Sequence, residues 1–157
     1  MDYNVEVLLE NNEEFAGYLK NRIKEFNNIH SAHHKNVRKA GSTQYINIIV
    51  SQNSDWVGGI SADVYWGWLE INDFWFNEEL RGRGFGKTLL QKTEEIAIDK
   101  GAQKSLLTTF DFQARNFYTK YGYEVVGEIK DYPPGSSYFT MVKTLVKEGT
   151  GWQKKNT

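Results

Sequence analysis

Hydrophobic residues change their spacing along the chain, and each change predicts a new element. Val5 to Leu9 alternates briefly, which is typical of a first strand. From Asn11, the expected N-cap, hydrophobic residues recur at helical spacing to about Asn28 and predict a helix with one apolar face. Residues 29–43 are polar and basic, and we expect a loop there with at most one helical turn.

The middle of the chain favours strands. Residues 44–51 and 56–66 are rich in Ile and Val and are joined by the turn-forming run 52–55, so they predict a hairpin. A third strand is expected over residues 68–76. The helix that follows the glycine-rich stretch after this strand should end at Lys100–Gly101, a cation followed by a helix-ending glycine.

The last third continues as strand 105–110, short helix 113–121, strand 123–129, turn 131–135 and strand 138–146. These elements predict an α+β fold with one parallel β-α-β step. We expect a single domain over residues 1–147, built on a mixed, mostly antiparallel sheet of about six or seven strands flanked by helices. Residues 148–157 form a polar tail.

Composition narrows the class of protein. A chain of 157 residues, 39% of them hydrophobic, suits one globular domain with a core. The net charge of −1 favours neither nucleic acid nor a membrane surface as a partner. The absence of Cys excludes disulfides and a cysteine nucleophile. With no export signal or membrane-spanning run, the sequence predicts a soluble cytoplasmic protein.

The stretch Arg81–Thr88 joins the third strand to the long helix and reads Arg-Gly-Arg-Gly-Phe-Gly-Lys-Thr. Glycines let a ligand approach the backbone, and amides at the start of a helix are unpaired and attract anions. Two arginines and Lys87 add full positive charges. The stretch therefore predicts a diphosphate site.

Glycine spacing separates the types of phosphate loop. A P-loop needs GxxxxGK[ST], and Arg81 stands where its first glycine belongs. A dinucleotide fingerprint needs GxGxxG, and both frames fail, at Lys87 and at Leu89. The pattern that fits is Arg-x-x-Gly-x-Gly, with Arg81, Gly84 and Gly86.

This pattern resembles the acetyl-CoA pyrophosphate loop of the GCN5-related N-acetyltransferase (GNAT) superfamily. A second segment, Ala114–Tyr123, is similar to the family's A-x-x-F-Y-x-x-x-G-[F/Y] segment. The resemblance covers most of the chain and is weakest before Gln44. It implies a fold of the GNAT type with acetyl-CoA as the co-substrate.

The resemblance also implies roles for individual residues. The backbone of Phe74 and Phe76 would hold the pantetheine arm as an added strand does. Asn116 would reach the cofactor from the other side. Asp111 replaces a cofactor-binding Asn of many members, and a carboxylate there suits an anionic cofactor poorly. The residues implied around the pyrophosphate are Arg81, Gly82, Arg83, Gly84, Phe85, Gly86, Lys87 and Thr88.

Two side chains are candidates for catalysis. Tyr118 occupies the position of the family's general-acid tyrosine, which protonates the leaving thiolate. Glu70, eleven residues before Arg81, matches the general-base glutamate of histone-type members. A backbone amide near Phe76 would polarise the carbonyl. Because the chain has no Cys, direct transfer in a ternary complex is expected.

These observations predict an acetyl-CoA-dependent N-acetyltransferase acting on a primary amine of a small molecule or peptide. The alternative is a non-catalytic acyl-CoA-binding module in which Tyr118 and Glu70 are structural. The acceptor and the oligomeric state stay open, with a homodimer favoured only by analogy. No metal is expected at His30, His33 and His34. Core packing, an acceptor pocket or a dimer contact would each explain the aromatic group Trp56, Tyr65, Trp66, Trp68, Phe74 and Trp75.

Overall fold

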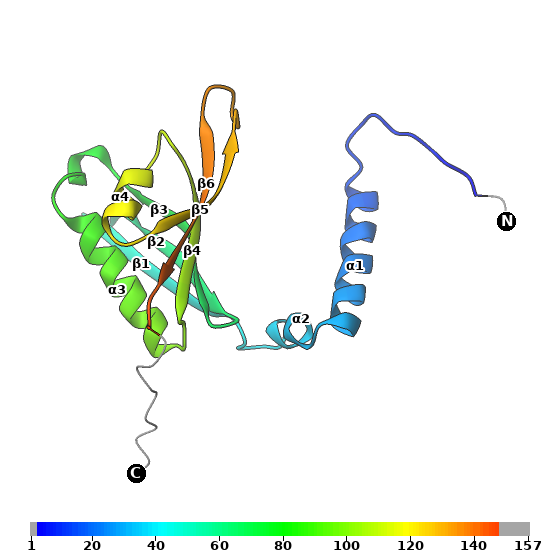
Figure 1. The fold of residues 1–157 in the computed structure, drawn as a ribbon, viewed down its shortest axis with the longest axis horizontal. Coiled ribbons are helices and arrows are strands. Elements are labelled where there is room, and N and C mark those ends of the chain that lie inside the picture. Colours follow the sequence, from blue (N-terminus) through cyan, green and yellow to red (C-terminus); the bar gives the residue numbers. More distant parts are fainter. Residues whose placement is uncertain (1–2, 148–157) are drawn as a thin grey trace, which may run out of the picture. The chain divides into compact units, whose positions relative to one another are not determined.

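The computed structural model describes residues 3–147. Residues up to Lys39 form one compact unit and residues from Ala40 onward form a second, so each is described by itself. The first holds α1 (Glu13–His30) and α2 (Ala32–Val37). The second holds β1 (Gln44–Gln52), β2 (Asp55–Tyr65), β3 (Trp68–Phe76), the 3₁₀ helix η1 (Glu78–Leu80), α3 (Phe85–Asp99), β4 (Lys104–Phe110), α4 (Arg115–Lys120), β5 (Glu124–Lys130) and β6 (Ser137–Thr144) (Figure 1). The expected single domain over residues 1–147 stays a prediction, and the expected polar tail, residues 148–157, lies outside the described residues.

The second unit is built on one six-stranded sheet in the order β1-β2-β3-β4-β6-β5. Neighbouring strands are antiparallel except β3 and β4, which are parallel and flank the crossover through α3. The mixed, mostly antiparallel sheet flanked by helices confirms the predicted fold class.

The core lies between the sheet and its helices α3 and α4, which Figure 1 shows on the same side of the sheet. Leu69 of β3, Leu107 of β4 and Met141 of β6 are almost completely buried, together with Leu90 of α3. Burial of such side chains stabilises the fold by about 1.5–3 kcal/mol each. These buried residues therefore show which face of each strand carries the core.

The turns follow the sequence closely. Asn53 and Ser54 adopt left-handed backbone conformations in the β1–β2 turn, and Trp66 and Gly67 do so in the β2–β3 turn. After α3, Lys100 caps the helix and Gly101 has φ +94°, which confirms the predicted helix end.

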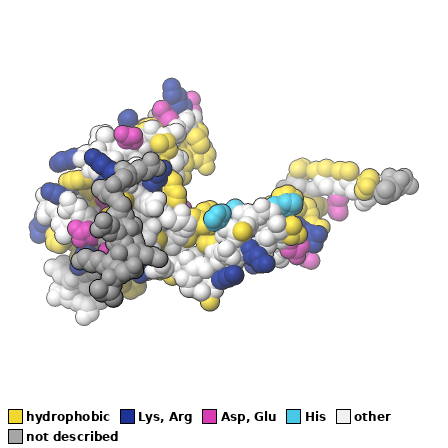
Figure 2. Space-filling view, turned by 60° about the horizontal axis from the view of Figure 1, so that its bottom comes forward, with side chains coloured by type: hydrophobic (Ala, Val, Ile, Leu, Met, Phe, Trp, Pro, Cys, Tyr) yellow, Lys and Arg dark blue, Asp and Glu magenta, His cyan; other side chains and the backbone are white. Residues whose placement is uncertain are grey.

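In the first unit, the N-cap of α1 lies one residue later than predicted. The side chain of Asn12, not Asn11, accepts the amide hydrogen of Phe15 at 2.9 Å. The apolar side of α1 is exposed within this unit, and Figure 2 shows hydrophobic side chains on this unit's surface beside the cyan histidines. The expected loop holds the six-residue α2, capped by Ser31, whose hydroxyl accepts the His34 amide hydrogen.

The predicted first strand over Val5–Leu9 is wrong, since these residues form no strand. Alternation supplies one face to bury, but a strand also needs hydrogen-bonded neighbouring backbone. Over residues 3–147, no helix is both long and apolar enough to cross a membrane.

Candidate active site

The sheet opens into a wedge between β3 and β4. The two strands pair over only three positions, from Trp68–Lys104 to Glu70–Leu106. Beyond Glu70, β3 continues to Phe76 paired with β2, while β4 continues to Phe110 paired with β6. The backbone of β3 after Glu70 therefore presents one edge that β4 does not pair.

A bulge in β3 decides which side chains face this wedge. Ser61 of β2 is opposite Asp73 and Ala62 is opposite Ile71, so Asn72 is the extra residue. The bulge shifts the alternation, so Phe74 and Phe76 pack on the core side with Ile71. Unshifted alternation would have placed both rings on the face of Glu70. Asp73 and Trp75 occupy that face instead.

The backbone of Phe74 and Phe76 points into the wedge. The amide of Asn77 donates to the Val57 carbonyl at 2.8 Å, so Asn77 faces β2. In an antiparallel pair, alternate residues direct their N–H and C=O groups to opposite edges. Phe76, and Phe74 two residues before it, therefore face the open edge. This edge suits an added extended segment, and the Phe76 carbonyl on it accepts a hydrogen bond from the Arg81 Nε at 3.2 Å.

At the end of β3 the chain turns through η1 into the glycine loop. Gly82 has φ +74° and Gly84 has φ +83°, a left-handed conformation that other residues adopt only with strain. Gly84 is the N-cap of α3, and the Thr88 amide donates to its carbonyl at 3.1 Å. The amides of the first helical turn before Thr88 lack intrahelical acceptors and are free for an anion.

Gly86 has a different reason to be glycine. A Cβ there would lie 3.2 Å from two ring atoms of Phe117 in α4, which is closer than nearly all Cβ contacts. The ring of Phe117 also packs 4.9 Å from Tyr121 and 5.9 Å from Phe74, measured between centroids. Gly86 thus allows α4 to pack directly on the start of α3.

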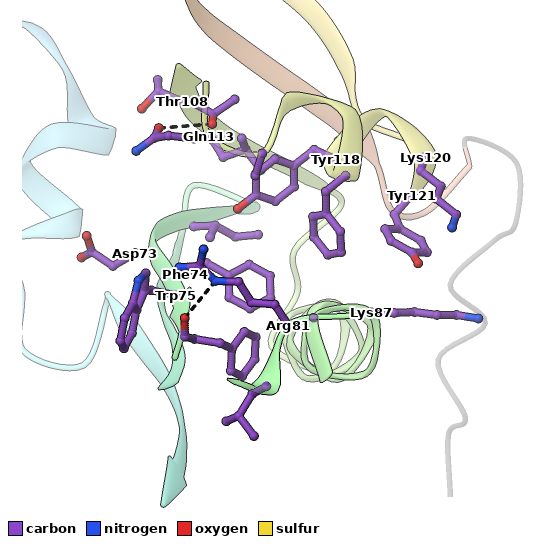
Figure 3. A pocket seen from close by; sticks show the side chains of 18 of the residues that line it. Asp73, Phe74, Trp75, Arg81, Lys87, Thr108, Gln113, Tyr118, Lys120 and Tyr121 are labelled. Carbon is purple, nitrogen blue, oxygen red and sulfur yellow. Dashed lines mark hydrogen bonds between the residues drawn. The ribbon is translucent and has the colours of Figure 1, made fainter. Parts of the chain in front are cut away.

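These features line one pocket of about 960 Å³ (Figure 3). Its walls come from β3, the glycine loop, β4 and α4. Eight of the predicted site residues line it, and the structure brings together Phe74, Phe76, Arg81, Gly82, Gly84, Gly86, Lys87 and Tyr118.

Tyr118 is the buried tyrosine of this pocket. Its ring packs 6.5 Å from Phe74 and 5.6 Å from Tyr123, and only 6% of the residue is exposed. Burial raises the pKa of Tyr118 to about 12. No hydrogen-bond partner of its hydroxyl is found among residues 3–147, and Figure 3 shows the side chain pointing into the pocket. The group stays protonated at neutral pH and can donate to a ligand.

Glu70 lies outside the described lining of this pocket. Its carboxylate accepts a hydrogen bond from the hydroxyl of Tyr65 on β2. That hydrogen bond, with burial and the charge of Glu70, raises the pKa of Tyr65 to about 12. The general-base role of Glu70 stays a prediction.

Four other predicted cofactor residues do not line the pocket, and their roles also stay predictions. The ring of Phe85 packs 6.1 Å from Phe76 on the core side. Arg83, Thr88 and Asn116 are exposed on the loop, on α3 and on α4.

Asp111 has a structural partner. Its carboxylate accepts the Ser137 amide hydrogen at 3.1 Å, and its amide donates to the Ser137 carbonyl. The side chain therefore fixes the end of β4 to the start of β6.

The pocket also contains residues that the sequence alone did not identify. Lys120 and Tyr121 lie three and four residues after Phe117, so helical spacing would have placed them on one side of α4. Trp75, for which an acceptor pocket is one of the predicted roles, lines this pocket beside Asp73, and the bulge determines the face on which both lie. Over residues 3–147, no cluster of three or more His, Cys, Asp or Glu is arranged to hold a metal ion.

Comparison with known proteins places this chain in a class of acyl-transferring enzymes. The chain belongs to the acetyltransferase (GNAT) family, whose model matches residues 8–123. This confirms the resemblance seen in the glycine loop and in the segment Ala114–Tyr123.

Individual relatives are acetyltransferases as well. Blasticidin-S acetyltransferase of Streptomyces morookaense is 34% identical over 102 residues, which are 64% of this chain and 75% of that protein. The crystal structure of an acetyltransferase from Bacillus cereus ATCC 14579 is 29% identical, with TM-score 0.71, covering 88% of this chain and 97% of that one. An aminoglycoside 6'-N-acetyltransferase complexed with coenzyme A shares the fold at 15% identity, with TM-score 0.58, 90% of this chain and 98% of that one being covered.

Proposed function

We propose that the protein transfers an acetyl group from acetyl-CoA to a primary amine of a small molecule or peptide. The observation that carries the proposal is a single pocket lined by an anion-binding helix start, an open strand edge and the hydroxyl of the buried Tyr118. Each of these three features matches one part of acetyl-CoA.

The pyrophosphate suits the free amides at the start of α3, where the helix dipole and nearby cations favour negative charge. The pantetheine arm suits the open edge at Phe74 and Phe76, because it can exchange amide hydrogen bonds with the backbone. The thioester then lies deeper in the wedge, on the side of Tyr118. The charged residues that line the pocket are Arg81, Lys87 and Lys120 with one acid, Asp73.

In the proposed reaction, the nitrogen of a neutral amine attacks the thioester carbonyl carbon. The C–N bond forms, a tetrahedral oxyanion collapses, and the C–S bond breaks to release the CoA thiolate. The nitrogen loses one proton to a base and the sulfur finally gains one, so acetyl-CoA and the amine give an amide and CoA. A wedge-facing amide near Phe76 would stabilise the oxyanion.

Tyr118 is proposed to donate a hydrogen bond to the leaving sulfur. With a pKa raised to about 12, its hydroxyl keeps its proton at neutral pH. Full transfer to a thiolate of ordinary thiol pKa, about 8.5, is uphill. Its contribution is therefore stabilisation of the developing thiolate, with solvent completing the protonation.

An amine acceptor is supported by the relatives, because blasticidin-S and aminoglycoside acetyltransferases are named for amine-bearing small molecules. Glu70 is kept as the proposed base, acting through water because it lies outside the described pocket lining. Asp73 is the second candidate. A cytoplasmic location stays a prediction.

The proposal is tested by following CoA thiol release with a panel of primary amines. We expect turnover with at least one amine and the mass of one added acetyl group on its nitrogen. The alternative, a non-catalytic acyl-CoA-binding module, predicts thermal stabilisation by acetyl-CoA without turnover of any amine. No stabilisation at all would contradict both, because acetyl-CoA at 100 times its Kd should stabilise by about 2.7 kcal/mol.

A further inference from the structure

Three cations line the pocket, Arg81, Lys87 and Lys120, and the two lysines lie at one end of it. Lys87 extends from the first turn of α3, and Lys120 extends from the last turn of α4. Figure 3 shows both on the side of the pocket away from Asp73 and Trp75. The pocket is therefore charged asymmetrically, with its basic end at α3 and α4.

Over residues 3–147, neither lysine forms an ion pair. The two ion pairs found among residues 3–147 are Arg22–Glu25 and Lys143–Glu94, and neither includes Lys87 or Lys120. Two uncompensated ammonium groups beside an anion pocket repel each other unless an anion lies between or beside them. The pair is thus suited to an anionic ligand group.

The position of Lys120 is set by packing. Phe117 lies against Gly86 and Tyr121, which holds the last turn of α4 next to the start of α3. The Nζ atom of Lys120 lies 5.7 Å from the centroid of the Tyr121 ring, within the range of a cation–π contact. Lys120 is therefore held near the loop although it belongs to another element.

The direction of the co-substrate identifies the anion. With the thioester in the wedge and the pyrophosphate on the loop, the adenosine end of CoA must leave at the opposite, basic end. That end carries a phosphate monoester, the 3'-phosphate, with a charge between about −1.5 and −2 at pH 7. Its charge is separate from that of the pyrophosphate and needs its own partners.

We infer that Lys120, together with Lys87, binds the 3'-phosphate and makes the protein select CoA thioesters over their 3'-dephospho forms. The inference rests on the proposed function for the location of acetyl-CoA, and it assigns a separate subsite that the loop motif does not contain. Lys120 is the specificity-determining residue, and Lys87 is shared between the two phosphate groups.

The test compares the Kd of acetyl-CoA with that of acetyl-3'-dephospho-CoA by isothermal titration calorimetry at low salt. We expect the intact protein to bind acetyl-CoA about tenfold more tightly, as one charge-assisted contact predicts. Lys120→Gln should lower this ratio of the two Kd values to about two. The double variant, with Lys87→Gln and Lys120→Gln together, should lower it to about one. The preference should also decline as salt is added.

Lys92→Gln is the matched control, because Lys92 is an exposed lysine of the same helix α3 outside the pocket. It should leave the ratio unchanged, whereas an equal loss there would show that only long-range charge matters and would overturn the inference. Equal affinity of the intact protein for both thioesters would overturn it too, while leaving the proposed function intact. Failure to bind either thioester would instead contradict the proposed function. Circular dichroism of each variant shows that it is folded.

Discussion

Removal of a single oxygen atom, the hydroxyl of Tyr118, tests the proposed chemistry. Replacing it with Phe keeps the ring that packs on Phe74 and removes the hydroxyl that reaches the pocket. We expect Tyr118→Phe to lower kcat by about 10²-fold, because the leaving sulfur loses its hydrogen-bond donor. Steady-state kinetics with the best amine of the panel measures this.

The Kd of acetyl-CoA should change little in the same variant, which separates loss of chemistry from loss of binding. Tyr45→Phe, at an exposed position on β1, is the control. Because burial raises the pKa of Tyr118 to about 12, the hydroxyl should not titrate below pH 10. Activity that falls between pH 8 and pH 10 in the intact protein but not in Tyr118→Phe would contradict the proposed role.

Two carboxylates on β3 compete for the role of base. Glu70 is hydrogen-bonded to Tyr65, and Asp73 lines the pocket. We expect Glu70→Gln to lower kcat/KM for the amine by about 10²-fold, in the range of general-base catalysis. Amine kinetics for Glu70→Gln, Asp73→Asn and Tyr65→Phe measure this. Full activity of Glu70→Gln beside an inactive Asp73→Asn would transfer the role to Asp73.

At the scale of elements, most of the fold follows from the sequence. The strands of the second unit are marked by β-branched residues and by turns such as Asn53–Ser54, which favour left-handed conformations. The predicted strand at Val5–Leu9 fails because alternation shows which face a segment would bury and does not provide a partner strand.

Part of the candidate site could likewise be predicted from the sequence, and part could not. The glycine loop was found from sequence because its spacing is local. The bulge at Asn72 could not be found, since it is a register shift against β2 and has no local signature. It moves Asp73 and Trp75 onto the face of Glu70, and it brings Phe74 and Phe76 to the core side. The partner of Glu70, Tyr65, likewise depends on the register of the β2–β3 hairpin.

The contact between α3 and α4 gives a prediction at this scale. Gly86→Ala places a methyl group against the Phe117 ring, so we expect the free energy of unfolding to fall by about 1–3 kcal/mol. The Kd for acetyl-CoA should rise as α4 shifts. Urea unfolding and calorimetry measure both.

A second substitution, Phe117→Leu, provides the room that the methyl group needs. In the background of Phe117→Leu, the cost of Gly86→Ala should shrink. Gly17→Ala in α1, where an added Cβ meets nothing within 4 Å, is the control and should be neutral or slightly stabilising. An equal cost of Gly86→Ala with and without Phe117→Leu would show that the ring is not the obstacle.

At the scale of the whole second unit, one buried ion pair connects the helix layer to the sheet. The Lys143 ammonium of β6 lies 2.6 Å from the nearer carboxylate oxygen of Glu94 on α3. Burial raises the pKa of Glu94, and attraction to Lys143 opposes this only in part. The folded protein therefore holds a proton on Glu94 more tightly than the unfolded chain does.

The raised pKa of Glu94 determines in which direction the free energy of unfolding changes with pH. As pH rises from the ordinary value of 4.5 through the raised pKa of Glu94, this group should lower the free energy of unfolding. Glu94→Gln should remove that decline. Urea unfolding at a series of pH values, with the exposed neighbour Glu95→Gln as control, measures it. If the intact protein instead became more stable than Glu94→Gln as pH rises, the attraction to Lys143 would dominate over the cost of burial.

The open edge of β3 has a consequence for how such a protein can diversify. Main-chain atoms at Phe74 and Phe76 would hold the co-substrate, and every residue type except proline supplies the same main-chain donor and acceptor. The side chains of Asp73 and Trp75 project from the face of β3 opposite to the one that carries the rings of Phe74 and Phe76. One strand thus encodes two kinds of recognition that can change separately. If the proposed function holds, substitutions at residues 73 and 75 would alter the choice of acceptor while the binding of the acetyl donor stays unchanged.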